Sequence, residues 1–351
     1  MTQNKILLDD FARIAQDYDF SALKNLSVFI TGSTGLIGSQ LVLFLDYLNK
    51  TQNYDTKIIA LVRSKEKAMR IFDKAFNRIF CVYGDVLNLP EISESVDYII
   101  HGASITSSKA FVEKPVEVID IAINGTKNIL EFAKKKNVKS FVYLSSLEVY
   151  GSFNSEIGIK NVTESEFGYI NTMSVRSSYS EGKRLCETLC KSYQSEYALS
   201  IKIARLCQTF GCGVEYNDNR VFAQFARSII ENRDIVLKTK GETIRNYCYT
   251  SDAISGILTV LLKGENGEAY NIANPDSTIS IKDMANLFCD LFKNSKSKVI
   301  FDLLDDTCKL GFNPVVKLQL DSSKLQSIGW HACIPLSEAI KKLVSYMGES
   351  K

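Results

Sequence analysis

Histidine, tryptophan and proline are scarce in this sequence. The chain of 351 residues contains two histidines, one tryptophan and five prolines. Two histidines are too few for a histidine-rich zinc site, and the nine cysteines form no C-x-x-C pair that would offer ligands at the usual spacing. We therefore expect no bound metal.

Excess charge, disulfides and long apolar runs are also missing. The 42 basic and 40 acidic residues leave a formal net charge of +2, which gives no overall attraction to nucleic acid or anionic membranes. The apolar run from Leu41 to Leu45 is far too short to cross a bilayer. The odd number of cysteines, in a chain without a signal peptide, predicts reduced thiols and a cytoplasmic protein.

The composition that remains is typical of a globular chain with one large or two modest domains. Hydrophobic residues make up 45% and charged residues 23%. Short segments rich in Val, Ile, Phe or Tyr alternate with stretches long enough for a helix. The expected strands are 26–30, 57–62, 79–83, 96–101 and 140–145. This alternation predicts a doubly wound α/β fold with a parallel sheet.

Three glycines follow the first expected strand, within the segment Thr31 to Gly38. They have the spacing G-x-x-G-x-x-G and precede an apolar helix, Ser39 to Leu48. A pyrophosphate needs bare backbone amides at close range and the positive end of a helix dipole. The strand–turn–helix setting therefore favours dinucleotide binding over the alternative, an ordinary tight turn.

Tyr179 and Lys183 form the only Y-x-x-x-K of the sequence. They are four residues apart in a segment with helical character, so both side chains project from one face. A neighbouring ammonium favours the phenolate, and we expect Lys183 to lower the pKa of Tyr179 and make it a usable base. A surface pair without function is the alternative.

Ser146 lies at the end of the fifth expected strand, in the segment LSSLEVYG. The glycine spacing, this serine and the Tyr–Lys pair, in this order, resemble the short-chain dehydrogenase/reductases. The resemblance implies a Rossmann-type fold with a smaller C-terminal substrate-binding domain, and NAD as cofactor with NADP as the alternative. It places the catalytic hydroxyl at Ser146, with Ser145 structural, beside Tyr179 and Lys183.

The same resemblance implies which residues hold the cofactor. Besides Tyr179 and Lys183, the implied contacts are Gly32, Thr34, Gly35, Leu36, Ile37, Asp85, Val86, Ala103 and Asn124. A family member that binds NAD usually has an acidic residue after the second strand, which holds the ribose 2′-hydroxyl. Here Arg63 and Lys65 stand instead. Arg63 either accepts a 2′-phosphate, which favours NADP, or is merely solvated.

Three further stretches resemble UDP-glucuronate decarboxylases, within the extended members that act on nucleotide sugars as epimerases or dehydratases. They are RSSYSEGKR at 176–184, NRV at 219–221, and TIRNY followed by SD within 243–252. The resemblance implies a homodimer that binds a nucleoside diphosphate sugar, whose phosphates suit arginine guanidinium groups. The implied substrate-binding residues are Ser146, Asn171, Arg176, Gln208, Arg220 and Arg245.

The sequence also departs from these relatives. Gln208 replaces the family's asparagine, and Leu147 stands where decarboxylases have a small hydroxyl residue and 4,6-dehydratases an aspartate. An aliphatic side chain neither donates a proton nor binds a carboxylate, which weakens the dehydratase hypothesis strongly and the decarboxylase hypothesis somewhat. Glu148 remains as a further catalytic candidate, able to remove a proton from C5 of the sugar.

The leading hypothesis is a UDP-glucuronate decarboxylase-like enzyme that works through transient oxidation at C4. The alternatives are a nucleotide-sugar 4-epimerase or 4,6-dehydratase and, from another class, a non-catalytic dinucleotide-sensing protein. The expected domains are a helical extension over 1–24, a dinucleotide-binding domain over 25–206, and a mainly substrate-binding domain over 207–351. Segments around 245–273 are expected to return to the dinucleotide-binding domain.

Overall fold

A parallel sheet of seven strands runs through the computed structural model of this chain, which describes residues 4–153, 158–304 and 315–349. The strand order is β12-β7-β5-β4-β1-β2-β3, and every neighbouring pair is parallel. The strands are β1 (Ser27–Thr31), β2 (Lys57–Val62), β3 (Phe80–Tyr83), β4 (Tyr98–His101), β5 (Ser140–Ser146), β7 (Ile201–Leu206) and β12 (Ala269–Ile272). The predicted doubly wound, Rossmann-type α/β fold is confirmed.

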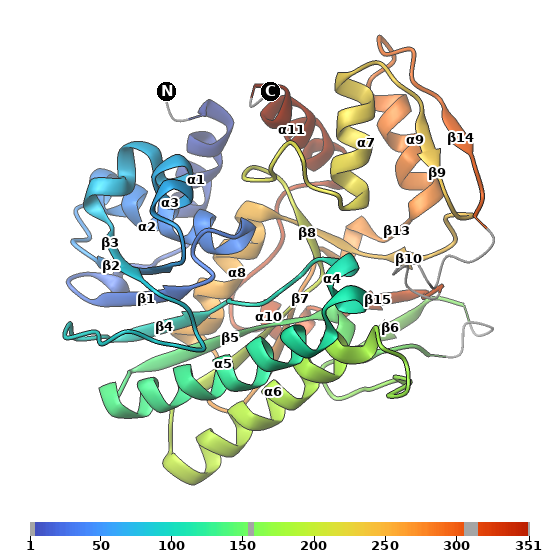
Figure 1. Ribbon diagram of the computed structural model, residues 1–351. Coiled ribbons are helices and arrows are strands. Elements are labelled where there is room, and N and C mark those ends of the chain that lie inside the picture. The colour runs from blue at the N-terminus through green and yellow to red at the C-terminus, as the bar shows by residue number, and fades with distance from the viewer. Residues whose placement is uncertain (1–3, 154–157, 305–314, 350–351) are drawn as a thin grey trace.

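Helices cover both faces of this sheet (Figure 1). The first layer contains α2 (Leu36–Gln52) and α8 (Thr250–Lys263), and the second contains α5 (Pro115–Lys136) and α6 (Ser177–Tyr197). Alternate residues of β1 pack against the two layers, because successive side chains of a strand point to opposite faces. Val28 and Ile30 join the first apolar core, and Phe29 joins the second. A strand buried on both faces is apolar at consecutive positions, as β1 is from Val28 to Ile30.

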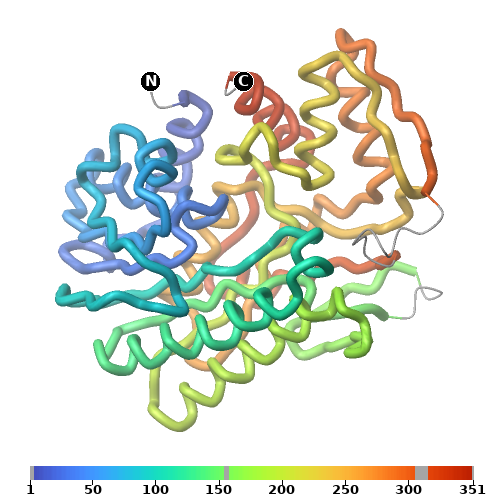
Figure 2. Tube along the Cα trace, in the orientation of Figure 1, coloured from blue at the N-terminus to red at the C-terminus, as the bar shows by residue number. Residues whose placement is uncertain are grey.

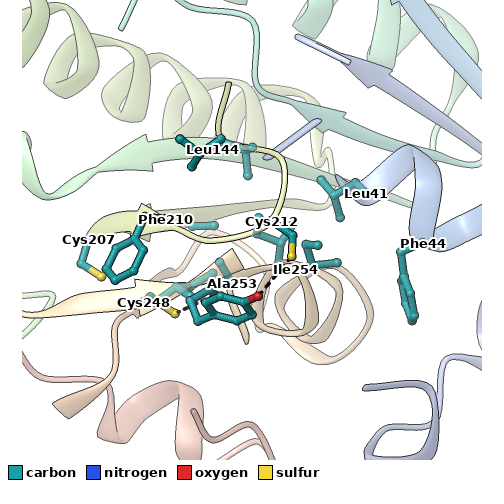
Figure 3. Packing of buried hydrophobic residues seen from close by; sticks show 14 of the residues in the cluster. Leu41, Phe44, Leu144, Cys207, Phe210, Cys212, Cys248, Ala253 and Ile254 are labelled. Carbon is teal, nitrogen blue, oxygen red and sulfur yellow. Dashed lines mark hydrogen bonds between the residues drawn. The ribbon is translucent and has the colours of Figure 1, made fainter. Parts of the chain in front are cut away.

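Figure 3 shows part of the first core from close by. Leu41 and Phe44 of α2, Leu144 of β5, and Ala253 and Ile254 of α8 are all buried there. Leu144 lies two residues before the carboxyl end of its strand. The packing therefore fixes that end of the sheet, which is where open α/β folds bind their ligands.

The N-terminal segment that we expected to be a helical extension contains α1 (Lys5–Asp17). Its apolar side packs on the first layer, where the rings of Phe11 and Phe44 have centroids 5.4 Å apart. The carboxylate of Asp252 at the start of α8 accepts a hydrogen bond from Arg13 at 2.7 Å. Helix α1 is thus part of the folded body of the protein.

The C-terminal third forms a smaller unit of helices and short strand pairs beside the sheet (Figure 1). The tube trace in Figure 2 shows the chain leaving the sheet for this unit and coming back. Strand β12 and helix α8 return to the sheet within the span 245–273. The unit contains α7 (Val221–Ile230), β9 (Ile235–Leu237), β10 (Ile244–Arg245), β13 (Ile279–Ser280), α9 (Ile281–Leu291), β14 (Val299–Phe301) and α11 (Leu336–Glu349).

Shorter elements connect these layers. They are α3 (Lys65–Phe72), α4 (Ser108–Glu113), β6 (Lys160–Val162), β8 (Gln208–Phe210), β11 (Tyr247–Tyr249), β15 (Leu318–Leu320) and α10 (Ser323–Gln326). Strand β8 pairs in parallel with β11, and β6 with β15. These pairs extend the carboxyl end of the sheet toward the C-terminal unit.

Candidate active site

The glycine turn between β1 and α2 leaves no space for side chains. Gly32 has a φ of +67°, and a Cβ there would lie 2.7 Å from the carbonyl carbon of Gly102. A Cβ at Gly38 would lie 2.2 Å from the carbonyl oxygen of Gly32. Helix α2 begins after Gly35, which has no side chain to cap the helix. The bare cradle and the first amides of α2, which have no partner within the helix, fit a dinucleotide phosphate.

The other predicted residues of this turn surround it. Thr34, Leu36 and Ile37 are half-buried, and the hydroxyl of Ser33 donates to the carbonyl oxygen of Leu61 in β2 at 2.6 Å. That bond joins the turn to the neighbouring strand, toward the position where a dinucleotide ribose lies in this fold.

The end of β2 carries a cation and no carboxylate partner for a ribose. Arg63 is exposed directly after the strand, and Ser64 caps α3 by accepting from the amide of Lys67 at 3.0 Å. The next acidic side chain, Glu66, accepts from the hydroxyl of Ser64 at 2.8 Å. Lys65 is also exposed, so both basic residues can reach an anion from solvent.

Asp85 and Val86 occupy the turn after β3. The Asp85 carboxylate accepts from the backbone amides of Leu87 at 2.8 Å and Asn88 at 3.0 Å, so this side chain shapes its own loop. Val86 is buried, and a Cβ on Gly125 of α5 would lie 2.6 Å from it. The loop after β3 is therefore packed against α5, beside the cradle.

The end of β4 is joined to β1 and α5 by a buried histidine. His101 lies between the hydroxyls of Thr31, 2.7 Å from Nδ1, and Thr126, 3.1 Å from Nε2. Ala103 follows at the edge of the glycine turn, where its amide hydrogen-bonds to Thr31 at 3.2 Å. The structure does not bring Asn124 to this place, because its side chain is exposed and donates to Asp120 within α5.

The two serines at the end of β5 have different environments. Ser145 is buried, and its hydroxyl donates to Oε1 of Glu187 at 2.5 Å. Glu187 also pairs with the buried Arg205, at 2.7 Å. Ser146 is half-buried at the mouth of the sheet, where its hydroxyl accepts from the amide of Glu148 at 3.3 Å. Ser145 is thus held by a buried ion pair, whereas the Ser146 hydroxyl keeps its proton for another partner.

Tyr179 and Lys183 lie on the side of α6 that faces β5. The ammonium of Lys183 donates to the carbonyl oxygen of Leu144 at 2.7 Å and lies 5.9 Å from the centroid of the Tyr179 ring. The hydroxyl of Ser146 at the strand end lies near enough to the phenol to lower the pKa of Tyr179. The three predicted catalytic groups therefore meet at the carboxyl end of the sheet.

The expectation that Lys183 lowers the pKa of Tyr179 is corrected by the structure. Burial raises the pKa of Tyr179 to about 12, against the smaller opposite effect of the Ser146 hydroxyl. Burial also lowers the pKa of Lys183 to about 8. The spacing of the two residues indicates that they are neighbours, but burial is the largest influence on both pKa values, and the charges that act on Tyr179 are those of Glu148 and Arg176.

Glu148 is held by α6. Its carboxylate accepts from Arg176 at 3.2 Å and from the hydroxyl of Ser180 at 3.2 Å. The side chains of Glu148 and Arg176 are 15% and 14% exposed, so this pair is only slightly hydrated. Two residues predicted for different roles, catalysis and substrate binding, thus form one ion pair beside Tyr179. Leu147, between Ser146 and Glu148, is buried and joins the first apolar core.

Arg245 is a buried cation in β10 of the C-terminal unit. Its side chain belongs to a residue that is 7% exposed, and its Nε has no hydrogen-bond partner among the described residues. An unsatisfied buried guanidinium N–H is costly unless a ligand accepts from it. The position suits an anionic group such as a phosphate.

The other predicted substrate contacts are more open. Arg220 donates to both carboxylate oxygens of Asp218, so its charge is already balanced. Gln208 begins β8 and is half-buried. Asn171 is exposed in the loop before α6, where its side chain accepts from the amide of Met173 at 3.0 Å. Of these three, only Gln208 lies in a strand, in the pair that β8 forms with β11.

One aromatic contact in the site has no counterpart among the sequence predictions. Phe111 of α4 stacks on Tyr179, with ring centroids 4.4 Å apart and planes inclined by 12°. The sequence gives one signal for Phe111. It lies in the segment between the expected strand 96–101 and Pro115, where a helix begins. Within the described ranges no group of three His, Cys, Asp or Glu residues suits a metal, and no helix has the length and apolarity to cross a membrane.

Solved structures of other proteins share this fold. UDP-N-acetylglucosamine 4-epimerase of Methanobrevibacter ruminantium, solved with UDP-N-acetylmuramic acid, has a TM-score of 0.78 at 21% identity, over 93% of this chain and 100% of that one. UDP-glucuronic acid 4-epimerase of Bacillus cereus, solved with NAD, has a TM-score of 0.76 at 20% identity, over 93% and 100%. These similarities confirm the Rossmann-like fold.

The sequence relatives carry the assignment further. UDP-glucuronic acid decarboxylase 5 of Arabidopsis thaliana is 30% identical, over 84% of this chain and 86% of its own length. The model of the NAD dependent epimerase/dehydratase family matches residues 28–273, which include the glycine turn, Ser146 and the Tyr–Lys pair. The chain therefore belongs to the NAD-dependent epimerase/dehydratase family, as the resemblance of its motifs predicted.

Proposed function

We propose that this chain binds NAD and a nucleoside diphosphate sugar, oxidises the sugar transiently at C4, and decarboxylates UDP-glucuronate. The observation that carries the proposal is the meeting of Ser146, Tyr179 and Lys183 at the end of β5. This place adjoins the glycine turn, because a Cβ on Gly102 would touch both Leu144 and the carbonyl oxygen of Thr31. The names of the Arabidopsis relatives support decarboxylation as the overall reaction.

The roles of the residues follow from their positions. Once its phenol has lost its own proton, Tyr179 takes the proton of the C4 hydroxyl, and Ser146 hydrogen-bonds to the same oxygen. The ammonium of Lys183 supplies positive charge beside the phenol when its proton leaves. When bound, NAD supplies a hydride acceptor and a positively charged ring. The backbone amides at the start of α2, beginning with Leu36 and Ile37, would hold its phosphates, and the glycines would let them approach.

Decarboxylation follows from the ketone at C4. A carboxylate on C5 beside that ketone makes a β-keto acid, whose C5–C6 bond breaks to release carbon dioxide and leave the electron pair in a C4–C5 enolate. A proton then returns to C5. Return of the hydride to C4, with Tyr179 giving its proton back to the C4 oxygen, would reduce the ketone and close the cycle. Arg245 is proposed to hold a phosphate of the substrate, and the Glu148–Arg176 pair lies near enough to Tyr179 to influence its charge.

A 4-epimerase is the second candidate, and Leu147 is the observation that favours it. This residue is buried and apolar next to Ser146, so it offers neither acid nor hydroxyl to C5 or C6. Without chemistry at C5, the ketone turns over in the site and receives hydride on its other face.

The preference for NAD or NADP belongs to the same proposal, with Arg63 as the group that would accept a 2′-phosphate. A homodimer is likewise proposed.

Mass spectrometry of the products tests the proposal. The protein is incubated with UDP-, dTDP-, CDP- and GDP-sugars, and loss of carbon dioxide, loss of water and unchanged mass separate the three reactions. Tyr179→Phe should lower turnover by about 10²–10⁴-fold, the range for losing a positioned acid–base group. The control Tyr169→Phe alters an exposed ring and should have no effect. Absence of NAD(H) and NADP(H) binding would refute the proposal, and a protein whose behaviour survives Tyr179→Phe would be a dinucleotide sensor.

A further inference from the structure

Tyr179 lies in a small apolar cluster that is separate from the two large cores. Its buried members are Phe111 of α4, Val118 of α5 and Tyr179 itself, with Ile105 and Ala110 packed at the edge. A cluster of this size has no structural need for a tyrosine, since all of its other members are apolar. The cluster encloses the one side chain that has to exchange a proton with substrate.

Phe111 makes the closest ring contact of that cluster. Its ring centroid is 4.4 Å from that of Tyr179, the planes differ by 12°, and Phe111 is 3% exposed. Stacked aromatic pairs of this kind contribute about 0.5–1.5 kcal/mol beyond the area that they bury. The contact therefore restrains the tilt of the phenol and keeps water from the ring face that Phe111 covers.

The first turn of α6 holds Phe111 by two further contacts. The hydroxyl of Ser178 donates to the carbonyl oxygen of Phe111 at 3.2 Å, and the guanidinium carbon of Arg176 lies 5.5 Å from the centroid of its ring. Ser178 and Arg176 are close neighbours of Tyr179 in the chain. Helix α4 is thus fastened to the same turn that carries the tyrosine.

We propose that Phe111 is a positioning residue for Tyr179, which fixes the phenol ring and shields it from water during proton transfer. The inference rests on the proposed function for the identity of the reaction, but the contact itself does not depend on the substrate. Phe111 has no polar side-chain atom, so it takes no part in the chemistry. Its effect reaches the reaction only through Tyr179.

Charged groups around the phenol, together with burial, set the pKa of Tyr179, and this pKa is the quantity that the loss of Phe111 should change. From α6, Arg176 favours the phenolate; from the end of β5, Glu148 disfavours it. The ammonium of Lys183 lies 5.9 Å from the ring centroid. On α4, Lys109 and Glu113 pair with each other at the surface, 3.6 Å apart. Burial is the largest influence on Tyr179, so admitting water should lower its pKa toward the ordinary value of about 10.

Nuclear magnetic resonance of tyrosine labelled at Cζ with a stable carbon isotope tests this inference. The Tyr179 signal is identified by its loss in Tyr179→Phe and followed from neutral pH to about pH 11. In Phe111→Ala and Phe111→Leu it should begin to titrate at lower pH than in the wild type. Phe111→Tyr keeps a ring in place and should restore the wild-type titration.

Turnover gives a second measurement. Phe111→Ala should lower kcat by up to about 10²-fold, the effect of a misplacement near 1 Å, while KM changes little. Phe288→Ala is the matched control, because it removes a buried ring that pairs with Phe225 in the C-terminal unit. It should lower thermal stability and leave the Tyr179 signal unchanged.

Two outcomes would overturn the inference. One is a Tyr179 signal that titrates as in the wild type in a folded Phe111→Leu or Phe111→Ala protein. The other is an equal change in Phe288→Ala, which would show a general loosening. Phe111→Leu keeps an apolar side chain and decides the question if Phe111→Ala does not fold. Because the titration needs no substrate, it decides even if no nucleotide sugar is converted and the proposed function fails.

Discussion

His101 shows how hydrogen bonds fix a single protonation state beside the cradle. The hydroxyl oxygen of Thr31 accepts from the backbone amides of Gly102 and Ala103, both at 3.2 Å. Its own proton is therefore donated to Nδ1 of His101, 2.7 Å away. The ring proton then lies on Nε2, which faces the hydroxyl of Thr126 at 3.1 Å. This network is complete only when the histidine is neutral.

Acid should destabilise the folded chain through His101. Burial, and then the charge of Lys183, lowers the pKa of His101 to about 3. An unfolded histidine titrates near pH ~6.5, so between these values only the unfolded state binds the proton. The free energy of unfolding therefore falls as the pH falls through this window, by up to ~1.4 kcal/mol per pH unit.

Thermal unfolding between about pH 7 and pH 4 measures this effect. His101→Gln should flatten the decline on the acid side, because glutamine does not titrate. His331→Gln is the matched control, since that side chain is exposed and its loss should leave the decline in place. A decline of equal slope in His101→Gln and the wild type would contradict the argument.

Glu148 supports a second prediction at this scale. If Glu148 acts on C5, Glu148→Gln should leave oxidation at C4 intact and slow the later step. Reduced nicotinamide would then accumulate in single-turnover absorbance traces, together with a 4-keto sugar. Glu181→Gln is the control, because the carboxylate of Glu181 pairs with Arg184, three residues later in α6, at 3.5 Å. It should give the same trace as the wild type. A trace equal to that of the wild type would remove Glu148 from catalysis and place the 4-epimerase ahead of the decarboxylase.

Single residues also show how far the sequence could predict the site. The motif spacing placed Ser146, Tyr179 and Lys183 together, because a strand end and one helix face are local geometry. It could not predict that Phe111, from a distant part of the chain, stacks on Tyr179, or that burial raises the pKa of Tyr179. Nor could it predict that Ser145 is held by Glu187, since this bond depends on how α6 lies on β5.

At the scale of elements, the turn between β1 and α2 allows a graded prediction. A Cβ on Gly38 would lie 2.2 Å from the Gly32 oxygen, so the backbone must shift. A Cβ on Gly35 would lie 3.2 Å from the same atom, at an ordinary φ of −83°. Gly38→Ala should therefore abolish NAD binding and cost about 1–3 kcal/mol of stability, the range for overpacking. Gly35→Ala should do much less.

Calorimetric titration with NAD, together with thermal unfolding, measures both effects. Gly348→Ala in α11 is the control, because nothing lies within 4 Å of the position that a Cβ would take there and alanine suits a helix better than glycine. If Gly38→Ala bound NAD as the wild type does, the turn would not be the cradle that its packing indicates.

The elements of the sheet were easier to predict than those of the C-terminal unit. The five expected strands correspond to β1 to β5, because each is a short run rich in apolar residues. The stretch 84–97 between β3 and β4 is long enough for a helix but contains none. Helix α2 begins at Leu36 rather than at Ser39, since the glycine turn passes directly into its first turn. Strand β9 pairs with β14, in which Val299 lies opposite Ile235. The two residues are more than 60 positions apart in the sequence, and no local pattern indicates such a pairing.

For the whole molecule, the packing of its two end helices is the main feature that lies outside the family's motifs. Both ends lie on the same side of the molecule in Figures 1 and 2. Lys342 of α11 pairs with the buried Asp10 of α1, at 2.5 Å. Arg13 of α1 pairs with Asp252, whose other carboxylate oxygen accepts from the backbone amides at Cys333 and Ile334. Helix α1 therefore joins the sheet to the C-terminal segment.

This arrangement predicts that α1 unfolds together with the rest of the molecule. Phe11 is fully buried, and its ring contacts those of Phe44 and Tyr47 in α2. Phe11→Ala should lower the free energy of unfolding by about 3–5 kcal/mol, the cost of emptying such a site, and the transition should stay single. Gln16→Ala, on the exposed side of the same helix, is the control and should change stability little.

Hydrogen exchange followed during denaturant unfolding distinguishes the two possible results. If α1 is part of the cooperative unit, Phe11→Ala speeds exchange in α1, α2 and α8 equally, because one global opening exposes all three. If α1 were an appendage, only its own amides would exchange faster, and the unfolding of the sheet would keep its wild-type midpoint. The buried pairs of Asp10 and Asp252 favour the first result, because separating α1 alone would take Arg13 away from the buried carboxylate of Asp252 and leave that charge without its cation.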